Sequence, residues 1–365
     1  MERILVLGLS KERGGIENYI FNTTERISSS DVGFDFLVKE QLNEEFYKRV
    51  NSMEGTVFVA GTFRKNIFKV WKSLCAFYKK NQYRKIYINL SYAPTLIYII
   101  PALWNKVETV YIHSHASDDI RYIRHVIFRK LFFDIILRKV KCVYMGCSVG
   151  ACEWMYGKRI CDNYEQIIVN NAVDYNRFMY KPEMTSKVRS QYKLNDNFVI
   201  GHVGRFGVEK NHTFLIQAFY ELQKNRENVR LLLVGNGPLR GEIEQLVEHL
   251  GITDKVVFVG ETSQVSDFYN AMDCFWLPSI YEGFPMVAVE AQVNGLRCVF
   301  SDKISKKIDI MGNNIFADIL DVKSWVNAVN EFPATYDRKV NRELVSILGY
   351  DLDKEVEKVR KVLLE

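Results

Sequence analysis

Short apolar runs that alternate with helical patterns place the strongest constraint on the fold of this chain. The first half contains seven such runs, at residues 3–8, 34–38, 56–60, 85–90, 109–113, 142–146 and 166–170. The segments between them are long enough for crossover helices. This rhythm is typical of a parallel sheet covered by helices on both faces.

The rhythm lapses across the polar residues 171–197 and then restarts. Five further runs follow, at residues 198–204, 230–235, 255–260, 274–279 and 297–302. The sequence therefore predicts an α/β protein with two doubly wound, Rossmann-like domains, at residues 1–180 and 181–345. Residues 346–365 form a charged amphipathic pattern that predicts a C-terminal helix, which could pack back on the first domain.

One uncharged segment invites comparison with a membrane span. Residues 86–105 carry no charge over 20 positions, but they include Pro94 and Pro101. Two prolines favour a strand, a turn and a short buried helix over one spanning helix. The charged start of the chain predicts a strand rather than an export signal, and seven cysteines without a CxxC pair predict free thiols. We therefore expect a cytoplasmic protein.

The charge is distributed unevenly between the halves. Residues 1–180 contain 26 Lys and Arg against 18 Asp and Glu, whereas residues 181–365 contain 23 against 26. No acidic residue occurs between Glu54 and Glu108. Such a basic surface suits an anionic partner.

Ligands of parallel sheets bind where the strands end, so chemically distinctive residues after the apolar runs are the candidates for a site. Arg205 and Lys210 follow the run at 198–204, immediately before a predicted helix. Two cations at a strand-to-helix turn suit a diphosphate. A solvated loop is the alternative for this segment taken alone.

The stretch "YEGFPMVAVE" (281–290) contains two acids and otherwise only Gly, Pro, Tyr and apolar residues. Pro285 suits the first position of a helix, where the amides of Met286 and Val287 would be free to bind an anion. Glu282 would precede that helix end, and Glu290 would lie about one turn inside it. One acid on each side of a phosphate site suits a nucleotide-sugar, although Glu290 could instead pair locally.

These segments together resemble a known family. Residues 278–295 resemble the E-x7-E signature of retaining family-4 glycosyltransferases of the GT-B fold, in which two Rossmann-like domains face each other across a cleft. Residues 13–20, 170–178, 201–210 and 231–260 resemble further elements of that family, in the expected order. The chain looks most like members that build bacterial capsular or exopolysaccharide repeat units.

The resemblance implies a role for each matching residue. It makes the first domain the acceptor domain and the second the nucleotide-sugar donor domain. The implied catalytic residues are Glu282, His113, Arg205 and Lys210. The implied donor-binding residues are Gly15, Arg205, Lys210, Gly237, Gly283, Phe284, Met286, Val287 and Glu290. Gly14 would permit the turn before Gly15, and spacing alone leaves open whether His113 or His115 is the functional histidine.

The sequence departs from the family pattern at Pro285 and Ala172, where glycine is common. Neither change touches the charged residues. No D-x-D motif lies between a predicted strand and its loop, where it would indicate a metal, and the nearest segment, "SDD" (117–119), is better explained as a helix start. We therefore expect neither a metal nor a cofactor, because the helix end, Arg205 and Lys210 could offset a leaving diphosphate.

The expected function is retaining transfer of a hexose or N-acetylhexosamine from a nucleotide-diphosphate sugar, UDP-linked by expectation, to a sugar acceptor on a lipid carrier. Two alternatives remain open: a nucleotide-sugar epimerase on the same scaffold, and a non-catalytic glycosyltransferase-like partner subunit. The epimerase lacks an identifiable acid–base set, and the partner subunit would be expected to lose Glu282 or Lys210. Nucleic acid is not an expected partner.

Residues 64–85 and 121–141 combine apolar and basic positions. Ile67, Phe68, Val70, Trp71, Leu74 and Tyr78 recur at helical spacing, with lysines mostly outside that stripe. This pattern predicts an interfacial surface that holds the protein peripherally on an anionic membrane. The alternative is that the apolar stripe packs on the sheet and the lysines are solvated.

Overall fold

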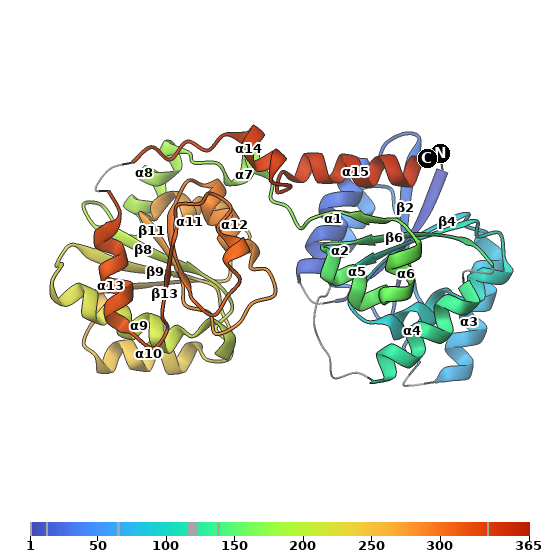
Figure 1. The fold of residues 1–365 in the computed structure, drawn as a ribbon, viewed down its shortest axis with the longest axis horizontal. Coiled ribbons are helices and arrows are strands. Elements are labelled where there is room, and N and C mark those ends of the chain that lie inside the picture. Colours follow the sequence, from blue (N-terminus) through green and yellow to red (C-terminus); the bar gives the residue numbers. More distant parts are fainter. Residues whose placement is uncertain (1, 12–13, 64–65, 116–122, 137–138, 334–335) are drawn as a thin grey trace. The chain divides into compact units, whose positions relative to one another are not determined.

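The computed structural model describes residues 2–11, 14–63, 66–115, 123–136, 139–333 and 336–365. The chain divides into two compact units, the first formed by Met1–Asn171 with Asp353–Glu365 and the second by Ala172–Leu352. The boundary between the two units thus follows Asn171, whereas the sequence analysis placed it after residue 180. Each unit is built on one sheet (Figure 1).

The first unit contains a seven-stranded parallel sheet in the order β3-β2-β1-β4-β5-β6-β7. Its strands are β1 (Glu2–Leu7), β2 (Val32–Val38), β3 (Val57–Val59), β4 (Lys85–Leu90), β5 (Thr109–Ser114), β6 (Lys141–Gly146) and β7 (Gln166–Ile168). All seven predicted runs form strands, and the central ones are buried between two layers of helices because they are continuously apolar.

Helices cover both faces of this sheet. They are α1 (Gly15–Ile27), α2 (Glu44–Ser52), α3 (Ile67–Asn81), the 3₁₀ helix η1 (Ala93–Trp104), α4 (Ile123–Ile136), α5 (Val149–Tyr156), α6 (Lys158–Asn163) and α15 (Leu352–Leu364). Phe21 of α1 packs on Phe36 of the sheet and on Phe46 of α2. The helices α3, η1 and α5 contribute to a separate apolar core with β4 and β5. The sheet is therefore doubly wound, as predicted.

The C-terminal helix α15 belongs to this first unit, although it follows the second unit in the chain. Arg26 of α1 pairs with Asp353, and Lys85 Nζ donates to the Leu363 carbonyl over 2.7 Å. Glu355 accepts a hydrogen bond from the Asn170 amide. These contacts agree with the expectation that the C-terminal helix packs on the N-terminal domain.

The second unit contains a six-stranded parallel sheet in the order β10-β9-β8-β11-β12-β13. Its strands are β8 (Phe198–Val203), β9 (Val229–Val234), β10 (Val256–Gly260), β11 (Cys274–Leu277), β12 (Arg297–Ser301) and β13 (Ile315–Ala317). The five predicted runs are confirmed. The sequence analysis missed β13, a three-residue edge strand that is too short to show a pattern.

The helices of the second unit are α7 (Tyr175–Phe178), α8 (Pro182–Gln191), η2 (Val208–Lys210), α9 (His212–Lys224), α10 (Arg240–His249), η3 (Thr253–Lys255), α11 (Val265–Ala271), α12 (Met286–Val293), η4 (Lys306–Ile308), α13 (Val322–Glu331) and α14 (Arg342–Ile347). The apolar residues of α9, α10 and α13 form one core with the sheet. Those of α11 and α12 form another. Two cores on one parallel sheet define a second doubly wound unit.

The uncharged segment 86–105 divides as predicted into β4 and the helix η1, which begins after Tyr92 and includes Pro101. Within the described ranges, no helix has both the length and the apolar composition needed to cross a membrane. All seven cysteines lie in the described part of the chain, and each is a free thiol.

Candidate functional site

Two loops at the carboxyl ends of β8 and β9 approach each other at backbone distance. A Cβ atom at Gly235, where φ is +137°, would lie 2.0 Å from the Gly204 carbonyl oxygen, and one at Gly237 would lie 2.6 Å from that of Phe206. The Phe206 amide donates to the Asn236 carbonyl over 3.0 Å. Gly235 and Gly237 are therefore required by close packing of these loops. Donor binding by Gly237 stays a prediction.

Lys210 and Glu282 form an ion pair between two strand-end loops. Lys210 ends η2 after β8, and Glu282 follows β11; Lys210 Nζ lies 2.6 Å from Glu282 Oε1. The side chains are only 13% and 14% exposed. Ser279 Oγ donates a second hydrogen bond of 2.8 Å to the same carboxylate oxygen. The structure thus brings together the two most important charged residues predicted from the sequence.

Arg205 lies in the loop that connects β8 to η2, and its side chain is exposed. Among the described residues it makes no ion pair, so its guanidinium is available to an anion. Lys210 is held by its ion pair with Glu282, whereas Arg205 makes no such pair in the described part of the chain. The protein therefore fixes the position of one of the two predicted diphosphate-binding cations and not of the other.

The helix α12 begins one residue later than predicted. Pro285 is the N-cap rather than the first helical residue, and Met286 begins the helix. The Ala288 amide already bonds to the Pro285 carbonyl over 3.0 Å. The amides of Met286 and Val287 precede the first such bond, as expected for an anion-binding helix end. Gly283 is exposed, and the Phe284 ring stacks on Tyr350 at 5.6 Å.

Glu290 lies one turn inside α12, as predicted, and Tyr269 of α11 holds it. The Tyr269 hydroxyl donates to Glu290 Oε2 over 2.8 Å. Burial raises the pKa of the Glu290 carboxyl, against the Tyr269 hydrogen bond and the charges of Arg177 and Lys210, which lower it. Glu290 therefore lies in the electrostatic field of Lys210 and also makes the local pairing that the sequence left open.

In the first unit, the Gly14-Gly15 turn opens α1. A Cβ atom at Gly14 would lie 2.7 Å from Glu17 Oε2, whereas one at Gly15 would meet no atom within 4 Å. Glu17 also accepts a hydrogen bond from the Ser10 amide. Within the described structure, the only close atoms at Gly14 belong to the end of a flexible side chain, and Gly15 has open space, so the roles predicted for both glycines stay predictions.

His113 and His115 lie together at the carboxyl end of β5. Their rings stack at 4.2 Å, and the Tyr19 ring of α1 packs edge-on against both. His113 Nδ1 lies 2.9 Å from the Tyr87 hydroxyl, and His115 Nε2 lies 2.9 Å from Asn89 Oδ1. His113 is 0% exposed and its Nε2 has no partner in the described structure, whereas His115 retains exposed surface. Both histidines therefore remain candidates.

Burial lowers the pKa of both imidazoles. The pKa of His113 falls well below its usual value because of burial and the neighbouring His115, and burial lowers the pKa of His115 to about 3. Both side chains are consequently neutral at physiological pH. They could polarise or orient a hydroxyl group but would not act as cations.

The sequence analysis missed four residues that support the candidate site. Ser279 and Tyr269 bond to the two acids, and Tyr19 and Tyr87 contact the histidines. Ser279 offered a signal, because it lies three residues before Glu282 in a strand-end loop. The tyrosines offered none, because they lie within apolar patterns that predict only core positions.

No group of His, Cys, Asp or Glu side chains suited to a metal ion occurs in the described ranges. The "SDD" segment lies outside the described residues.

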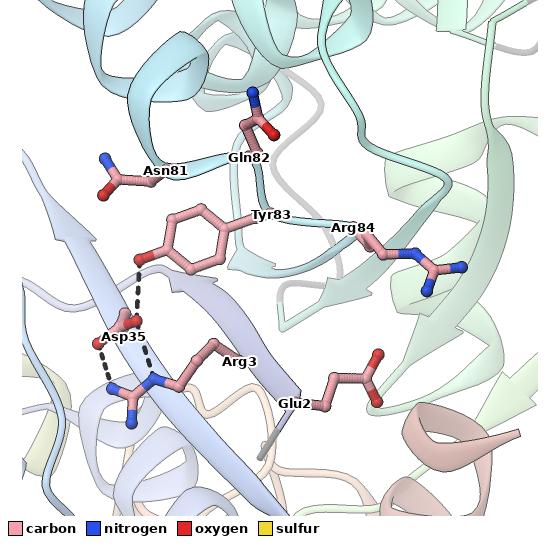
Figure 2. Close-up of a pocket in the computed structure, with 7 residues that line it drawn as sticks. All are labelled: Glu2, Arg3, Asp35, Asn81, Gln82, Tyr83 and Arg84. Atoms are coloured by element: carbon pink, nitrogen blue, oxygen red, sulfur yellow. Dashed lines mark hydrogen bonds and ion pairs between the residues drawn. The ribbon is translucent and has the colours of Figure 1, made fainter.

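A cavity of about 690 Å³ occurs in the first unit, at the amino ends of β1 and β4 (Figure 2). Asp35 accepts hydrogen bonds there from Arg3 and Tyr83, and Arg84 pairs with Glu108 at 2.7 Å. Burial raises the pKa of Asp35, but the hydrogen bonds from Arg3 and Tyr83 outweigh it and lower the pKa. The charged groups of this cavity pair with one another, and they lie at the amino ends of the strands, whereas the histidines lie at the carboxyl end of β5. We therefore do not assign the site to this cavity.

The predicted apolar stripe of α3 divides between core and surface. Val70, Leu74 and Tyr78 are buried against the sheet, whereas Ile67, Phe68 and Trp71 are exposed, Phe68 to 87%. The helix η1 packs against both α3 and α4, and it exposes Trp104 to 61%. We call this the α3–α4 surface; its exposed residues are Ile67, Phe68, Lys69, Trp71, Lys72, Trp104, Lys106, Val126, Ile127, Lys130 and Leu131. The prediction also included Lys65, Arg121 and Arg138, which lie outside the described residues, and Arg124, whose side chain is not described.

Comparisons with known proteins show which proteins the chain resembles. Residues 184–336 match the family model of glycosyl transferases group 1. The putative glycosyltransferase EpsF of Bacillus subtilis (strain 168) is 26% identical over 371 residues, which cover 97% of this chain and 94% of that protein. A UDP-Gal:alpha-D-GlcNAc-diphosphoundecaprenol alpha-1,3-galactosyltransferase of Escherichia coli is 24% identical over 264 residues, covering 62% of this chain and 65% of that protein.

Solved structures extend the likeness to the whole fold. The crystal structure of HepE from Anabaena in complex with UDP and glucose superposes with a TM-score of 0.74, at 18% identity, and covers 100% of both chains. This likeness shows the fold: the chain has the GT-B fold of glycosyltransferases. Residues 184–336 match the group 1 glycosyl transferases, and the similarity to EpsF extends over nearly the whole chain.

Proposed function

We propose that this glycosyltransferase moves a hexose or N-acetylhexosamine from a UDP-sugar to a lipid-linked sugar acceptor, with retention of the anomeric configuration. The observation that carries the proposal is the Lys210–Glu282 pair, which lies at the carboxyl ends of two neighbouring strands. In open α/β sheets this edge is where ligands bind.

The second unit would bind the donor. Arg205, Lys210 and the first amides of α12 would stabilise the negative charge of the diphosphate as it leaves. Glu282 would accept hydrogen bonds from donor-sugar hydroxyls, and Glu290 from the ribose. Because fixed cations and amides can perform the electrostatic role of a metal, the proposed mechanism uses neither a metal nor a cofactor.

The first unit would supply the acceptor side and one contact to the donor sugar. His113, or His115 in its place, would contact the sugar as a neutral imidazole. No enzyme nucleophile is evident, so we propose front-face displacement, in which the leaving phosphate helps to deprotonate the acceptor hydroxyl. Gly15 would let the backbone approach the phosphates and the reacting sugar.

The choice of donor and acceptor has support from relatives. The Escherichia coli relative is named for transfer from UDP-galactose to a diphosphoundecaprenol-linked sugar, and the HepE structure contains UDP and glucose. The segments quoted above resemble capsular and exopolysaccharide enzymes. We therefore propose a polysaccharide repeat-unit precursor as the acceptor.

We further propose that the α3–α4 surface holds the protein at an anionic lipid surface. Exposed aromatic and aliphatic side chains lie there beside Lys69, Lys72 and Lys130. Apolar groups insert at the headgroup boundary, and each nearby basic side chain contributes about 1 kcal/mol toward an anionic leaflet. Such binding would place the enzyme peripherally on the cytoplasmic face, where a lipid-linked acceptor is available.

A donor screen tests the proposed function. Purified protein is incubated with UDP-, GDP- and ADP-sugars and a lipid-diphosphate sugar, and nucleotide release and the anomeric configuration of the product are measured. We expect release that requires the acceptor and a product that retains the donor configuration. Conversion of the donor without acceptor would indicate an epimerase, and binding without turnover a non-catalytic subunit; either result would overturn the proposal.

A further inference from the structure

Tyr269 is a fully buried tyrosine whose hydroxyl contacts the predicted ribose-binding acid. The hydroxyl lies 2.8 Å from Glu290 Oε2 and 3.2 Å from the Val287 carbonyl oxygen. A hydroxyl has one proton, and the carboxylate is both closer and charged, so the stronger hydrogen bond goes to Glu290. Tyr269 thereby ties the α12 acid to α11.

The two oxygens of Glu290 have different surroundings. Oε2 is occupied by Tyr269, whereas Oε1 has no hydrogen-bond partner among the described residues, and Glu290 retains some exposed surface. A half-buried carboxylate with one anchored oxygen has restricted rotamers. The second oxygen is consequently presented in a defined direction and can accept from a ligand.

We propose that Tyr269 is a positioning residue for the donor nucleotide. Its hydroxyl holds Glu290 in the rotamer that accepts a hydrogen bond from a ribose hydroxyl. The inference rests on the proposed role of Glu290, but it assigns a separate residue that the sequence did not indicate.

The position of the Tyr269 ring does not depend on its hydroxyl. The ring packs against Phe178 at 5.9 Å and Phe275 at 5.8 Å, and its backbone carbonyl accepts a hydrogen bond from Arg338. Phenylalanine at position 269 should therefore occupy the same space. The Tyr269→Phe variant removes only the contact to α12, which makes it a clean probe.

A matched control exists in the same unit. The Tyr336 hydroxyl donates to the Asp273 carbonyl over 2.9 Å and accepts from the Arg297 amide, with no contact to the predicted site residues. Tyr336→Phe thus removes a comparable internal hydroxyl. Any general effect of losing such a hydroxyl should appear equally in both variants.

The experiment is a double-mutant cycle with Tyr269→Phe and Glu290→Gln. UDP, GDP and ADP all carry the ribose, so any of them can report the proposed contact. The probe is the one that wild-type protein binds most tightly. Calorimetry gives the affinity, and turnover gives KM and kcat. We expect Tyr269→Phe to weaken binding about tenfold and raise KM with kcat within twofold, as for the loss of one charge-assisted contact.

Three comparisons make the result decisive. In the Glu290→Gln background, Tyr269→Phe should have no further effect; additive losses would overturn the inference. If Glu290→Gln weakens binding and Tyr269→Phe does not, the inference fails while the proposed function stands. If Glu290→Gln leaves binding unchanged, or wild type binds none of the three nucleotides, the proposed role of Glu290 fails first.

A pH profile separates positioning from simple packing. The charged and titratable groups facing Glu290 are Tyr269 from α11, Arg177 from α7 and Lys210 from η2, and all three lower the pKa of its carboxyl. Loss of the hydroxyl should raise that pKa, so nucleotide affinity should begin to fall at a higher pH during acidification in Tyr269→Phe. If nucleotide affinity in Tyr269→Phe fell over the same acidic pH range as in wild type and in Tyr336→Phe, the inference would be overturned.

Discussion

Lys210 Nζ lies 2.6 Å from Glu282 Oε1, so a single ion pair joins two loops that are 72 residues apart in the chain. The Ile280 amide also donates to the Glu209 carbonyl over 2.9 Å. The strand-end loops of β8 and β11 are thereby fixed before any ligand arrives. Preorganised charges of this kind stabilise a transition state without the cost of rearrangement.

Removal of either partner should nearly abolish sugar transfer. Lys210→Ala and Glu282→Ala should each lower kcat by about 10²–10³, because a contact to the developing charge or to the sugar is lost. Nucleotide release and circular dichroism measure turnover and folding. Lys224→Ala breaks an exposed pair with Glu221 in the same unit and should leave turnover unchanged. A variant at either position that kept more than about a third of wild-type turnover would remove that residue from the mechanism.

Glu290→Gln should weaken donor binding more than it slows chemistry. A ribose contact exists in both the ground and transition states, so its loss should appear mainly in KM. Steady-state kinetics with varied donor concentration separate the effect on KM from the effect on kcat. An unchanged KM with a collapsed kcat would instead place Glu290 beside the reacting atoms.

Acid should destabilise both units through buried histidines. Burial lowers the pKa of His115 to about 3, and burial with the charge of Lys210 lowers that of His212 to about 4. Below about pH 6.5 the unfolded chain binds protons that the folded state does not. The free energy of unfolding should therefore fall as the pH drops below 6.5, by about 1 kcal/mol per histidine at pH 5.5.

Urea unfolding at pH 7.5 and pH 5.5 measures this loss. His115→Gln and His212→Gln should each reduce the difference in unfolding free energy between pH 7.5 and pH 5.5. His249→Gln, at an exposed position, is the control. An identical pH dependence in all three variants and wild type would contradict the assignment of neutral, buried imidazoles.

Charge reversal on the α3–α4 surface should release the protein from anionic vesicles. Two lysines near the leaflet contribute about 2 kcal/mol, so Lys69→Glu with Lys72→Glu should weaken binding at least about 30-fold at low salt. Sedimentation with phosphatidylglycerol vesicles measures the binding. Nucleotide affinity should not change.

Two controls complete the vesicle experiment. Lys306→Glu with Lys307→Glu makes the same charge change in the second unit and should leave sedimentation unchanged. Phe68→Ser should weaken binding even in neutral vesicles, while Leu320→Ser, at another highly exposed apolar position, should not. Equal wild-type binding to neutral and anionic vesicles, or no binding to either at low salt, would rule out an anionic membrane surface.

Gly235→Ala should disrupt the loops at the ends of β8 and β9. The added Cβ atom would lie 2.0 Å from the Gly204 carbonyl oxygen, at a φ of +137° that alanine rarely adopts. We expect a loss of several kcal/mol of stability, about 3 or more. Gly241→Ala in α10, where the Cβ atom meets nothing within 4 Å, should raise stability by about 0.5–1 kcal/mol. Equal thermal midpoints for the two variants would contradict the close approach of the loops.

The sequence by itself determined the two sheets and the positions of the charged site residues. Buried parallel strands need continuous apolar runs, and ligand-binding groups must follow them, so twelve strands and the places of Lys210, Glu282 and Glu290 could be predicted locally. The edge strand β13 could not be predicted, because three residues are too few to show an apolar periodicity. The start of α12 at Met286 could not be predicted either, because a proline can occupy the N-cap or the first helical position.

Only the tertiary structure decided which groups contact the site residues. Tyr269 reaches Glu290 across 21 positions and Lys210 reaches Glu282 across 72, and no local pattern encodes either distance. The α3 stripe shows the same limit: a helical period identifies apolar positions, but the sheet beneath buries Val70 and leaves Phe68 exposed. Periodicity reports what a side chain prefers, whereas its neighbours are set by how the elements pack.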